Sequence, residues 1–255
     1  MKILKKALLG VTVPFIILIA WWFVTANGLI PSSLLPTLQS VKSAFIEATQ
    51  SGQLQSDLLI SLKRVVQGFL MASVLGIFLG TVMGMSKTLC AMLLPLVTTI
   101  RQIPMIAWFP LIILWCGIGE LSKVVVIVIA AFFPVLVNTL NGIQSTPDSY
   151  IEVADLYKLT KLERFTKLYM PHALPDILVG VKLGLGVSWM AGVAAELVAA
   201  TSGIGFRMND ARSMMRSDKV IVCMILIGLV GVLMDKLVTV LFGVLTPWEK
   251  VQNKK

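Results

Sequence analysis

Long apolar runs alternate with polar stretches along the whole chain. A helix needs about 20 mostly apolar residues to cross a bilayer. By this criterion the pattern predicts an all-α, multi-pass membrane protein with about six spans in one domain, residues 1–255. The expected spans are residues 7–26, 62–86, 88–117, 122–143, 174–200 and 218–245. A polar stretch at residues 144–172 separates the fourth span from the fifth.

The third apolar region differs from the others because polar and helix-breaking residues interrupt it. Pro95, Arg101, Pro104 and Pro110 all lie within it. Proline lacks a backbone donor and kinks a helix, and irregular backbone at membrane depth is tolerated only inside protein or beside a water-filled cavity. The sequence therefore predicts a broken span that faces the interior of the protein.

Composition and charge agree with a membrane location. Hydrophobic residues make up 57% of the 255 residues and charged residues only 14%, whereas soluble domains carry about 25% charged residues. The net charge of +9 comes from basic residues between apolar runs, which argues against nucleic-acid binding and for the positive-inside rule. Lysines at both ends of the chain place both termini in the cytoplasm, although Arg207, Arg212 and Arg216 then lie outside.

The second span carries small residues at every fourth position, namely Gly68, Ala72, Gly76, Gly80 and Gly84. This spacing lets two helix backbones approach closely. We expect Gly76, Gly80 and Gly84 to form a tight helix–helix contact. The partner helix could belong to this chain or to another.

The sequence contains no recognisable catalytic or metal-binding pattern. Cys90, Cys116 and Cys223 lie in apolar runs without metal-ligand spacing, His172 stands alone, and no phosphate-binding P-loop is present. We therefore expect a protein that is not an enzyme and that binds no metal or cofactor itself.

Charged and polar residues inside spans are candidates for a substrate path. An arginine at the path would suit an anion, but Arg101 could instead pair with Glu196. Trp108 and Trp189 could wall the path or face lipid, and Asn138 and Ser188 could line it or bond between helices. The candidates are Arg101, Trp108, Asn138, Ser188, Trp189 and Glu196.

Residues 144–172 predict two short helices joined by a turn, projecting from the cytoplasmic face. Glu152, Val153 and Ala154, followed by Leu168, Met170 and Pro171, resemble the EAA loop of permease subunits of bacterial ABC importers. Lys158 occupies the position of the family's glycine. A lysine held there in a left-handed turn would cost about 1 kcal/mol, so either the turn differs or the strain is tolerated.

The resemblance covers roughly residues 57–245. Residues 101–120, 179–189, 195–197 and 202–206 are similar to segments of the permeases for nitrate, taurine and aliphatic sulfonates. It implies the type I, MetI-like importer fold in a bacterial inner membrane. The implied ATPase-coupling residues are Glu152, Val153, Ala154, Leu156, Tyr157, Lys158, Leu159, Arg164, Leu168 and Pro171.

The resemblance also implies partners. Two cytoplasmic ATPase subunits would bind ATP and Mg and dock on the loop, a second permease copy would complete the path, and an extracytoplasmic binding protein would deliver a small anion. Precursors of the thiamine pyrimidine or of riboflavin are alternative cargoes. An ion-driven secondary carrier is the alternative mechanism, although such carriers more often show broken helices in both halves.

Overall fold

The computed structural model describes the backbone of residues 2–245 and the side chains of residues 12–243, and every element in that part is helical. The elements are α1 (Lys2–Ala26), α2 (Leu38–Gln50), α3 (Gln53–Met85), α4 (Lys87–Ile100), α5 (Met105–Cys116), α6 (Glu120–Gln144), α7 (Asp148–Leu156), α8 (Lys161–Arg164), the π-helical turn η1 (Phe165–Tyr169), α9 (Met170–Ala199), α10 (Ile204–Ser213) and α11 (Ser217–Leu245). The predicted all-α membrane architecture is confirmed.

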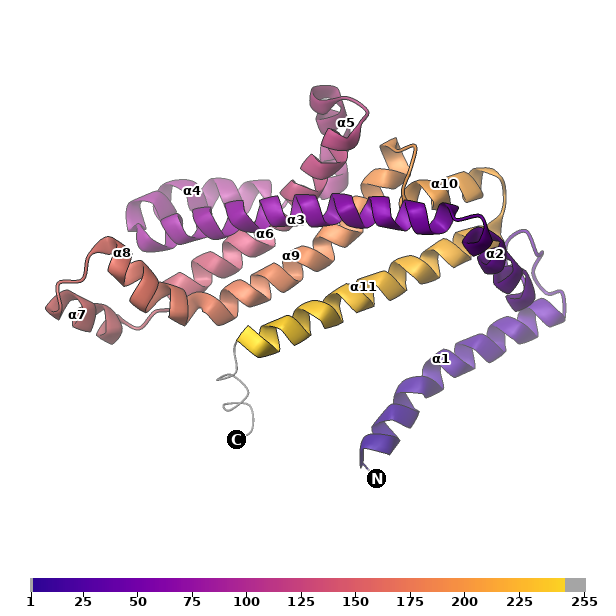
Figure 1. The fold of residues 1–255 in the computed structure, drawn as a ribbon, viewed down its shortest axis with the longest axis horizontal. Coiled ribbons are helices and arrows are strands. Elements are labelled where there is room, and N and C mark those ends of the chain that lie inside the picture. The colour runs from indigo at the N-terminus through magenta and orange to yellow at the C-terminus, as the bar shows by residue number, and fades with distance from the viewer. Residues whose placement is uncertain (1, 246–255) are drawn as a thin grey trace.

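The long helices α3, α6, α9 and α11 run along the longest axis of the molecule (Figure 1). Helix α6 packs between α3 and α9, and α11 covers α9. The short helices α7 and α8 project at one end of the bundle, and α2 and α10 lie at the other. The bundle therefore has two functionally distinct ends.

The small-residue stripe of α3 packs against α6 of the same chain. A Cβ atom added at Gly80 would lie 2.7 Å from the Leu136 carbonyl oxygen and 2.8 Å from the Thr139 Cβ. One added at Gly76 would lie 2.9 Å from the Val135 Cβ, and one at Gly84 would lie 2.7 Å from the Ile143 side chain. These separations leave no room for any side chain, so the two backbones meet directly along the stripe.

The third apolar region does not form one straight span. It divides into α4 and α5, which are bent by 97° at residues 101–104. Pro104 causes the break, because its ring disfavours helical geometry at Ile103 and it cannot donate to a preceding carbonyl. Gly117, at a φ of 74°, then ends α5. The predicted interruption is present, and it is a full change of direction.

Among the residues that the structure describes, four helices are long and apolar enough to cross a membrane: Gln53–Met85, Glu120–Gln144, the continuous run Lys161–Ala199, and Ser217–Gly243. A fifth span results if the bent pair of α4 and α5 counts as one. Within α1 the residues with described side chains give a shorter apolar segment, Thr12–Ala26. The first of the six expected spans thus coincides with α1, although its first residues lie outside the described side chains.

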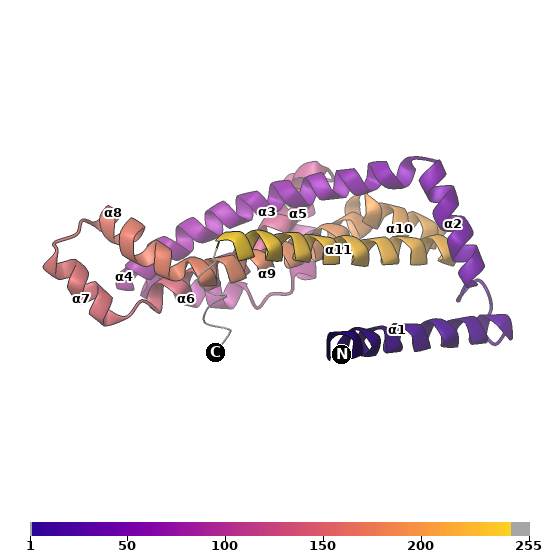
Figure 2. The same cartoon turned by 60° about the horizontal axis from the view of Figure 1, so that its bottom comes forward.

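Helix α1 lies apart from the bundle in two views of the molecule (Figure 1 and Figure 2). Its last turn is held by a hydrogen bond from the Trp21 Nε1 to the Pro36 carbonyl oxygen at 2.9 Å. Most of its described apolar side chains are exposed, including Phe15, Ile17 and Trp22. An apolar helix with this much exposed surface needs lipid or another protein surface around it.

Candidate functional site

The α7–α8 hairpin is a rigid projection because both of its helix ends are capped. At the end of α7, Lys158 donates its N–H to the Asp155 carbonyl at 2.9 Å and Leu159 donates to the Ala154 carbonyl at 3.0 Å. This pair of bonds is a Schellman motif with Lys158 at the left-handed position, φ 51°. The turn expected from the family glycine is therefore present, and Lys158 adopts it.

The start of α8 is fixed by reciprocal bonds between Thr160 and Glu163. The Glu163 N–H donates to the Thr160 hydroxyl at 3.3 Å, and the Thr160 N–H donates to the Glu163 carboxylate at 3.0 Å. Arg164 pairs with the Asp155 carboxylate across the hairpin and donates to the Leu159 carbonyl at 3.1 Å. These contacts tie the two helices of the hairpin together, so the hairpin can move as one rigid body.

Apolar side chains of the hairpin face outward. Leu156 is 81% exposed and Tyr157 is 78% exposed, although the aqueous exposure of such side chains is unfavourable. Beside them an open cavity of about 410 Å³ is lined by Tyr150, Val153, Ala154, Tyr157, Leu159, Lys167 and Leu168. Glu152 is exposed on the same helix. Five of the ten coupling residues inferred from the sequence thus line this cavity, namely Val153, Ala154, Tyr157, Leu159 and Leu168.

Pro171 does not end a separate loop but lies inside a continuous helical run. Helix α8, the π turn and α9 form one helical run from Lys161 to Ala199. Pro171 follows the π turn directly, so the wider turn accommodates its missing N–H and its ring. The hairpin is therefore joined to the α9 span without a break.

Three of the six path candidates meet in a second cavity, of about 420 Å³, at the bend between α4 and α5. Arg101 and Trp108 line it from the bend and from α5, and Asn138 lines it from α6. Arg101 is exposed and forms no salt bridge with any side chain in residues 12–243. Apolar side chains, among them Phe133, Leu183 and Val187, complete the wall.

The other three candidates lie elsewhere. Ser188 is completely buried, and its hydroxyl has no partner among the described groups. Trp189 donates its Nε1 hydrogen to the Ile227 carbonyl at 3.0 Å and so holds α9 to α11. Glu196 pairs with Arg64 at 2.7 Å. The alternative pairing of Glu196 with Arg101 is therefore wrong, because α3 supplies a nearer cation.

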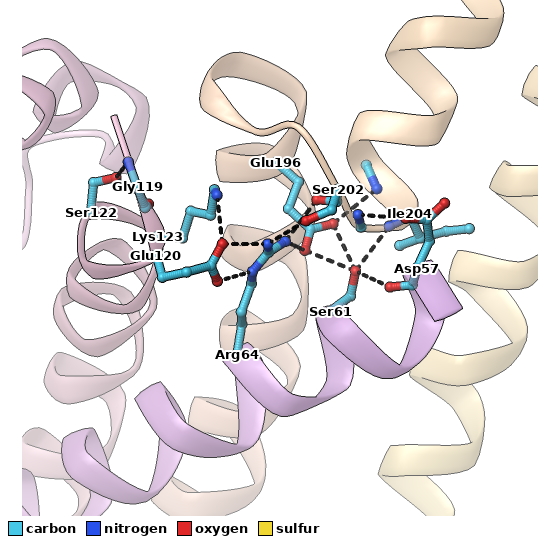
Figure 3. Close-up of polar contacts among 12 residues, drawn as sticks. Asp57, Ser61, Arg64, Gly119, Glu120, Ser122, Lys123, Glu196, Ser202 and Ile204 are labelled. Atoms are coloured by element: carbon cyan, nitrogen blue, oxygen red, sulfur yellow. Dashed lines mark hydrogen bonds and ion pairs between the residues drawn. The ribbon is translucent and has the colours of Figure 1, made fainter. Parts of the chain in front are cut away.

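Around Glu196 a cluster of charged side chains joins α3, α6, α9 and α10 (Figure 3). Arg64 donates to both oxygens of Glu120, each at 2.6 Å, and to Glu196 and the Ser202 carbonyl at 2.7 and 2.8 Å. Lys123 donates to Glu120 at 3.0 Å. Arg64, Lys123 and Glu196 are all less than 5% exposed.

The same cluster anchors the start of α10. The N–H groups of Gly203, Ile204 and Gly205 donate to Asp57, Ser61 and Glu196 at 2.9, 2.9 and 3.0 Å. Carboxylates suit this position because the first N–H groups of a helix have no partner within it and carry partial positive charge. At Gly203, φ 109°, an added Cβ would lie 2.4 Å from the Glu196 carboxylate.

Sequence reasoning missed Asp57, Ser61 and Arg64 as members of this cluster. Their spacing of four and three residues places them on one face of a helix, and this was the available signal. A polar stripe at the start of a long apolar helix indicates buried polar partners from other helices.

At the same end of the bundle, Glu47 of α2 is tied to the start of α11. The Lys219 ammonium donates to it at 2.8 Å and the Arg216 guanidinium at 3.2 Å. These two cations hold the pKa of the Glu47 carboxyl below its usual range. The carboxylates of Glu47 and Asp218 in turn pair with Arg216, one of the arginines that count against cytoplasmic termini.

Residues 72–250 match the model of a protein family described as "Binding-protein-dependent transport system inner membrane component". The match covers well over half of the chain, and the chain belongs to this family. It is a permease subunit of an ABC importer, located in the inner membrane, which confirms the resemblance inferred from the sequence.

Three individual relatives indicate which permeases of this family the chain resembles. SsuC of Bacillus subtilis, named for aliphatic sulfonates transport, is 36% identical over 94% of this chain and 87% of its own length. The taurine permease TauC of Escherichia coli is 33% identical over 96% of this chain and 90% of its own. The nitrate import permease NrtB of Synechocystis is 37% identical over 74% of this chain and 69% of its own.

Solved structures show the fold. The chain is similar to the MetNI methionine ABC transporter, with a TM-score of 0.58, 18% identity, and coverage of 71% of this chain and 92% of that one. It is also similar to an amino acid ABC transporter, with a TM-score of 0.64, 16% identity, and coverage of 76% and 95%. The predicted MetI-like permease fold is confirmed.

Proposed function

We propose that this permease forms the translocation path for a small anion that an extracytoplasmic binding protein delivers. Two cytoplasmic ATPase subunits, which bind ATP and Mg, drive transport through the α7–α8 hairpin. The observation that carries this proposal is the hairpin itself: a capped, rigid projection with an exposed apolar surface, continuous with the spanning helix α9.

Docking explains the exposed side chains of the hairpin. Tyr157 and Leu156 offer apolar anchors beside an open cavity, and aromatic residues in pockets dominate many protein interfaces. Glu152 near the start of α7 can pair with a basic residue of the ATPase. Since α8, the π turn and α9 are continuous, a displacement of the hairpin moves the α9 wall of the path.

The orientation follows from charge. Lys158, Lys161, Arg164 and Lys167 all belong to the hairpin and its junction with α9, and an excess of lysine and arginine marks the cytoplasmic side. Helices α1 and α11 both run back from the α2–α10 end, which supports cytoplasmic termini (Figure 1). The α2–α10 end then faces the binding protein.

A second copy of the chain would complete the path. The cavity at the α4–α5 bend is open, and its one cation, Arg101, is exposed in the isolated chain. The two helices that flank the bend also expose apolar side chains, including Ile106, Leu114 and Trp115 of α5 and Met92 of α4. A homodimer would cover this surface and bring two copies of the cavity together.

The relatives favour an anion as the cargo. The names of three of them give aliphatic sulfonates, taurine and nitrate, and the cavity presents an arginine without an ion-pair partner in the described chain. An uncharged precursor of the thiamine pyrimidine or of riboflavin would leave Arg101 without a role.

Co-purification tests the proposal. A tagged copy, expressed in its native cell and extracted in mild detergent, should bring down an ATPase subunit in equal number. Native mass measurement should give two permeases and two ATPases. If the chain purifies alone or only with itself, the coupling role of the hairpin fails and an ion-driven carrier becomes the better interpretation.

A further inference from the structure

Two buried cations at the α2–α10 end share one carboxylate that is largely open to solvent. The side chains of Arg64 and Lys123 are 4% and 5% exposed, whereas that of Glu120 is 65% exposed. Arg64 binds both Glu120 oxygens at 2.6 Å, and Lys123 binds one of them at 3.0 Å. An exposed carboxylate thus neutralises two buried cations.

The two carboxylates on Arg64 are held very differently. Glu196 is 1% exposed and also accepts hydrogen bonds from the Ser61 hydroxyl and the Gly205 N–H. Glu120 accepts only from the two cations among the bonds of the described residues. Removing Glu196 would leave several buried donors without an acceptor. Glu120 can instead move into water, after which only Arg64 and Lys123 need another anion.

From this arrangement we infer that Arg64 and Lys123 form an anion-exchange site, in which Glu120 is the resident counter-ion and the anionic group of the cargo displaces it. This inference rests on the proposed import of an anion and deepens it. A planar guanidinium beside an ammonium matches a sulfonate, a carboxylate or nitrate. The site lies at the end of the bundle that faces the binding protein.

Charge balance defines the class of ligand. One monoanion replaces one carboxylate, so the charge of the buried cluster does not change during the exchange. A dianion would bring an additional negative charge next to Glu196, which is bound to the same arginine. The site should therefore select small monoanions over dianions such as sulfate.

One face of α6 runs from this site to the cavity. Lys123 and Ala130 are about two helical turns apart, and Pro134 is one further turn along, so the three lie on similar faces of the helix. Ala130, Pro134 and Asn138 line the cavity that contains Arg101. Lys123, with Arg64 of α3 beside it, thus lies at one end of a face of α6 whose further part lines the cavity that contains Arg101.

The test is a thermal-unfolding titration of the purified full-length chain in detergent. Sodium methanesulfonate is the probe, and sodium gluconate, whose anion is much larger, keeps the ionic strength constant. Glu120→Gln removes the resident charge at nearly constant shape. The melting temperature of this variant should rise by roughly 3 °C when methanesulfonate saturates the site. The variant should reach this rise at a methanesulfonate concentration at least about tenfold lower than the wild type requires.

Matched variants make the result specific. Glu163→Gln removes an exposed carboxylate whose partner, Lys167, is itself 62% exposed, so its response should equal that of the wild type. Lys123→Met alone keeps the Arg64–Glu120 pair but should lose the response. The double variant with Glu120→Gln should also lose it. Sulfate should be a weaker ligand than methanesulfonate for Glu120→Gln.

The inference is overturned if Glu120→Gln responds no better than the wild type, or if Lys123→Met retains the response. A wild type that never responds would show that Glu120 is not displaced, which also overturns it. The titration uses neither the ATPase nor the binding protein. Failure of co-purification would therefore remove the importer mechanism, whereas failure of the titration would remove only the exchange site.

Discussion

Arg64 of α3 and Glu196 of α9 form an ion pair at 2.7 Å across 132 positions of sequence, with 4% and 1% of their side chains exposed. Withdrawing two charges from water costs several kcal/mol for each ion, and the pair alone does not always repay this cost. Here Ser61, Ser202 and Gly205 complete the hydrogen bonds of both groups. The pair therefore specifies how α3, α9 and α10 meet.

Arg64→Met should destabilise the protein strongly, because it leaves Glu196 buried without its cation. The expected loss is about 3–5 kcal/mol, or a fall of roughly 10 °C in the melting temperature of the detergent-solubilised chain. Adding Glu196→Leu should restore part of the loss, because the buried carboxylate that lost its cation is then removed as well. Arg212→Met removes an exposed arginine of α10 and should change the melting temperature little. A mild effect of Arg64→Met alone would contradict the assignment.

Gly80→Ala should destabilise the contact between α3 and α6. The added Cβ would lie 2.7 Å from the Leu136 carbonyl oxygen, which belongs to a helix backbone and cannot rotate away. Overpacking of this kind costs about 1–3 kcal/mol. Gly228→Ala in α11 is the control, because a Cβ there meets nothing within 4 Å. Equal melting temperatures for the two variants would show that α3 can move away without cost.

Lys158→Gly should stabilise the turn of the hairpin, by up to about 1 kcal/mol, because glycine adopts a positive φ without strain. Exchange of the Leu159 amide hydrogen, which bonds the Ala154 carbonyl, should become slower. Lys158→Ala removes the charge but keeps the strain and should give no protection. Met215, at φ 56°, occupies the equivalent position after α10, and Met215→Gly should protect the Arg216 amide in the same way.

The sequence was sufficient to predict features that depend on one helix at a time. Apolar length predicted the long helices α3, α6, α9 and α11, the prolines predicted the break at residues 101–104, and glycine spacing predicted the close-packing face of α3. The α7–α8 hairpin followed from turn residues and from its resemblance to the family loop.

What the sequence could not supply was the pairing of distant side chains. The sequence offered Arg101 as the cation for Glu196, and only the packing of α3 beside α9 shows that Arg64 is its partner. The same holds for Pro171, which looks like a helix boundary in sequence but lies in a continuous run because the preceding π turn makes space for it. Both cases depend on geometry that arises after the helices have formed.

Glu152→Ala should weaken association with the ATPase and leave the permease stable. Glu152 is exposed and forms no salt bridge with another described side chain. Its loss should therefore change the free energy of unfolding by less than about 0.5 kcal/mol. Loss of one charge-assisted contact should lower the affinity about tenfold, measured as the ATPase recovered with the tagged chain. Asp148→Ala, also an exposed carboxylate of α7, is the control. Unchanged recovery for Glu152→Ala would remove this residue from the interface.

Arg101→Gln should reduce uptake of an anionic cargo while assembly and ATPase recovery remain normal. The structure gives Arg101 no ion-pair partner within residues 12–243 and places it at the wall of the 420 Å³ cavity, so its loss leaves no buried charge behind. Uptake of labelled methanesulfonate by cells that express the variant is the measurement, with a fall of about tenfold expected for one lost charged contact. Arg101→Lys keeps the charge without the planar guanidinium and should give an intermediate rate. Equal uptake by Arg101→Gln and the wild type would show that the cavity at the bend does not contact an anion during transport.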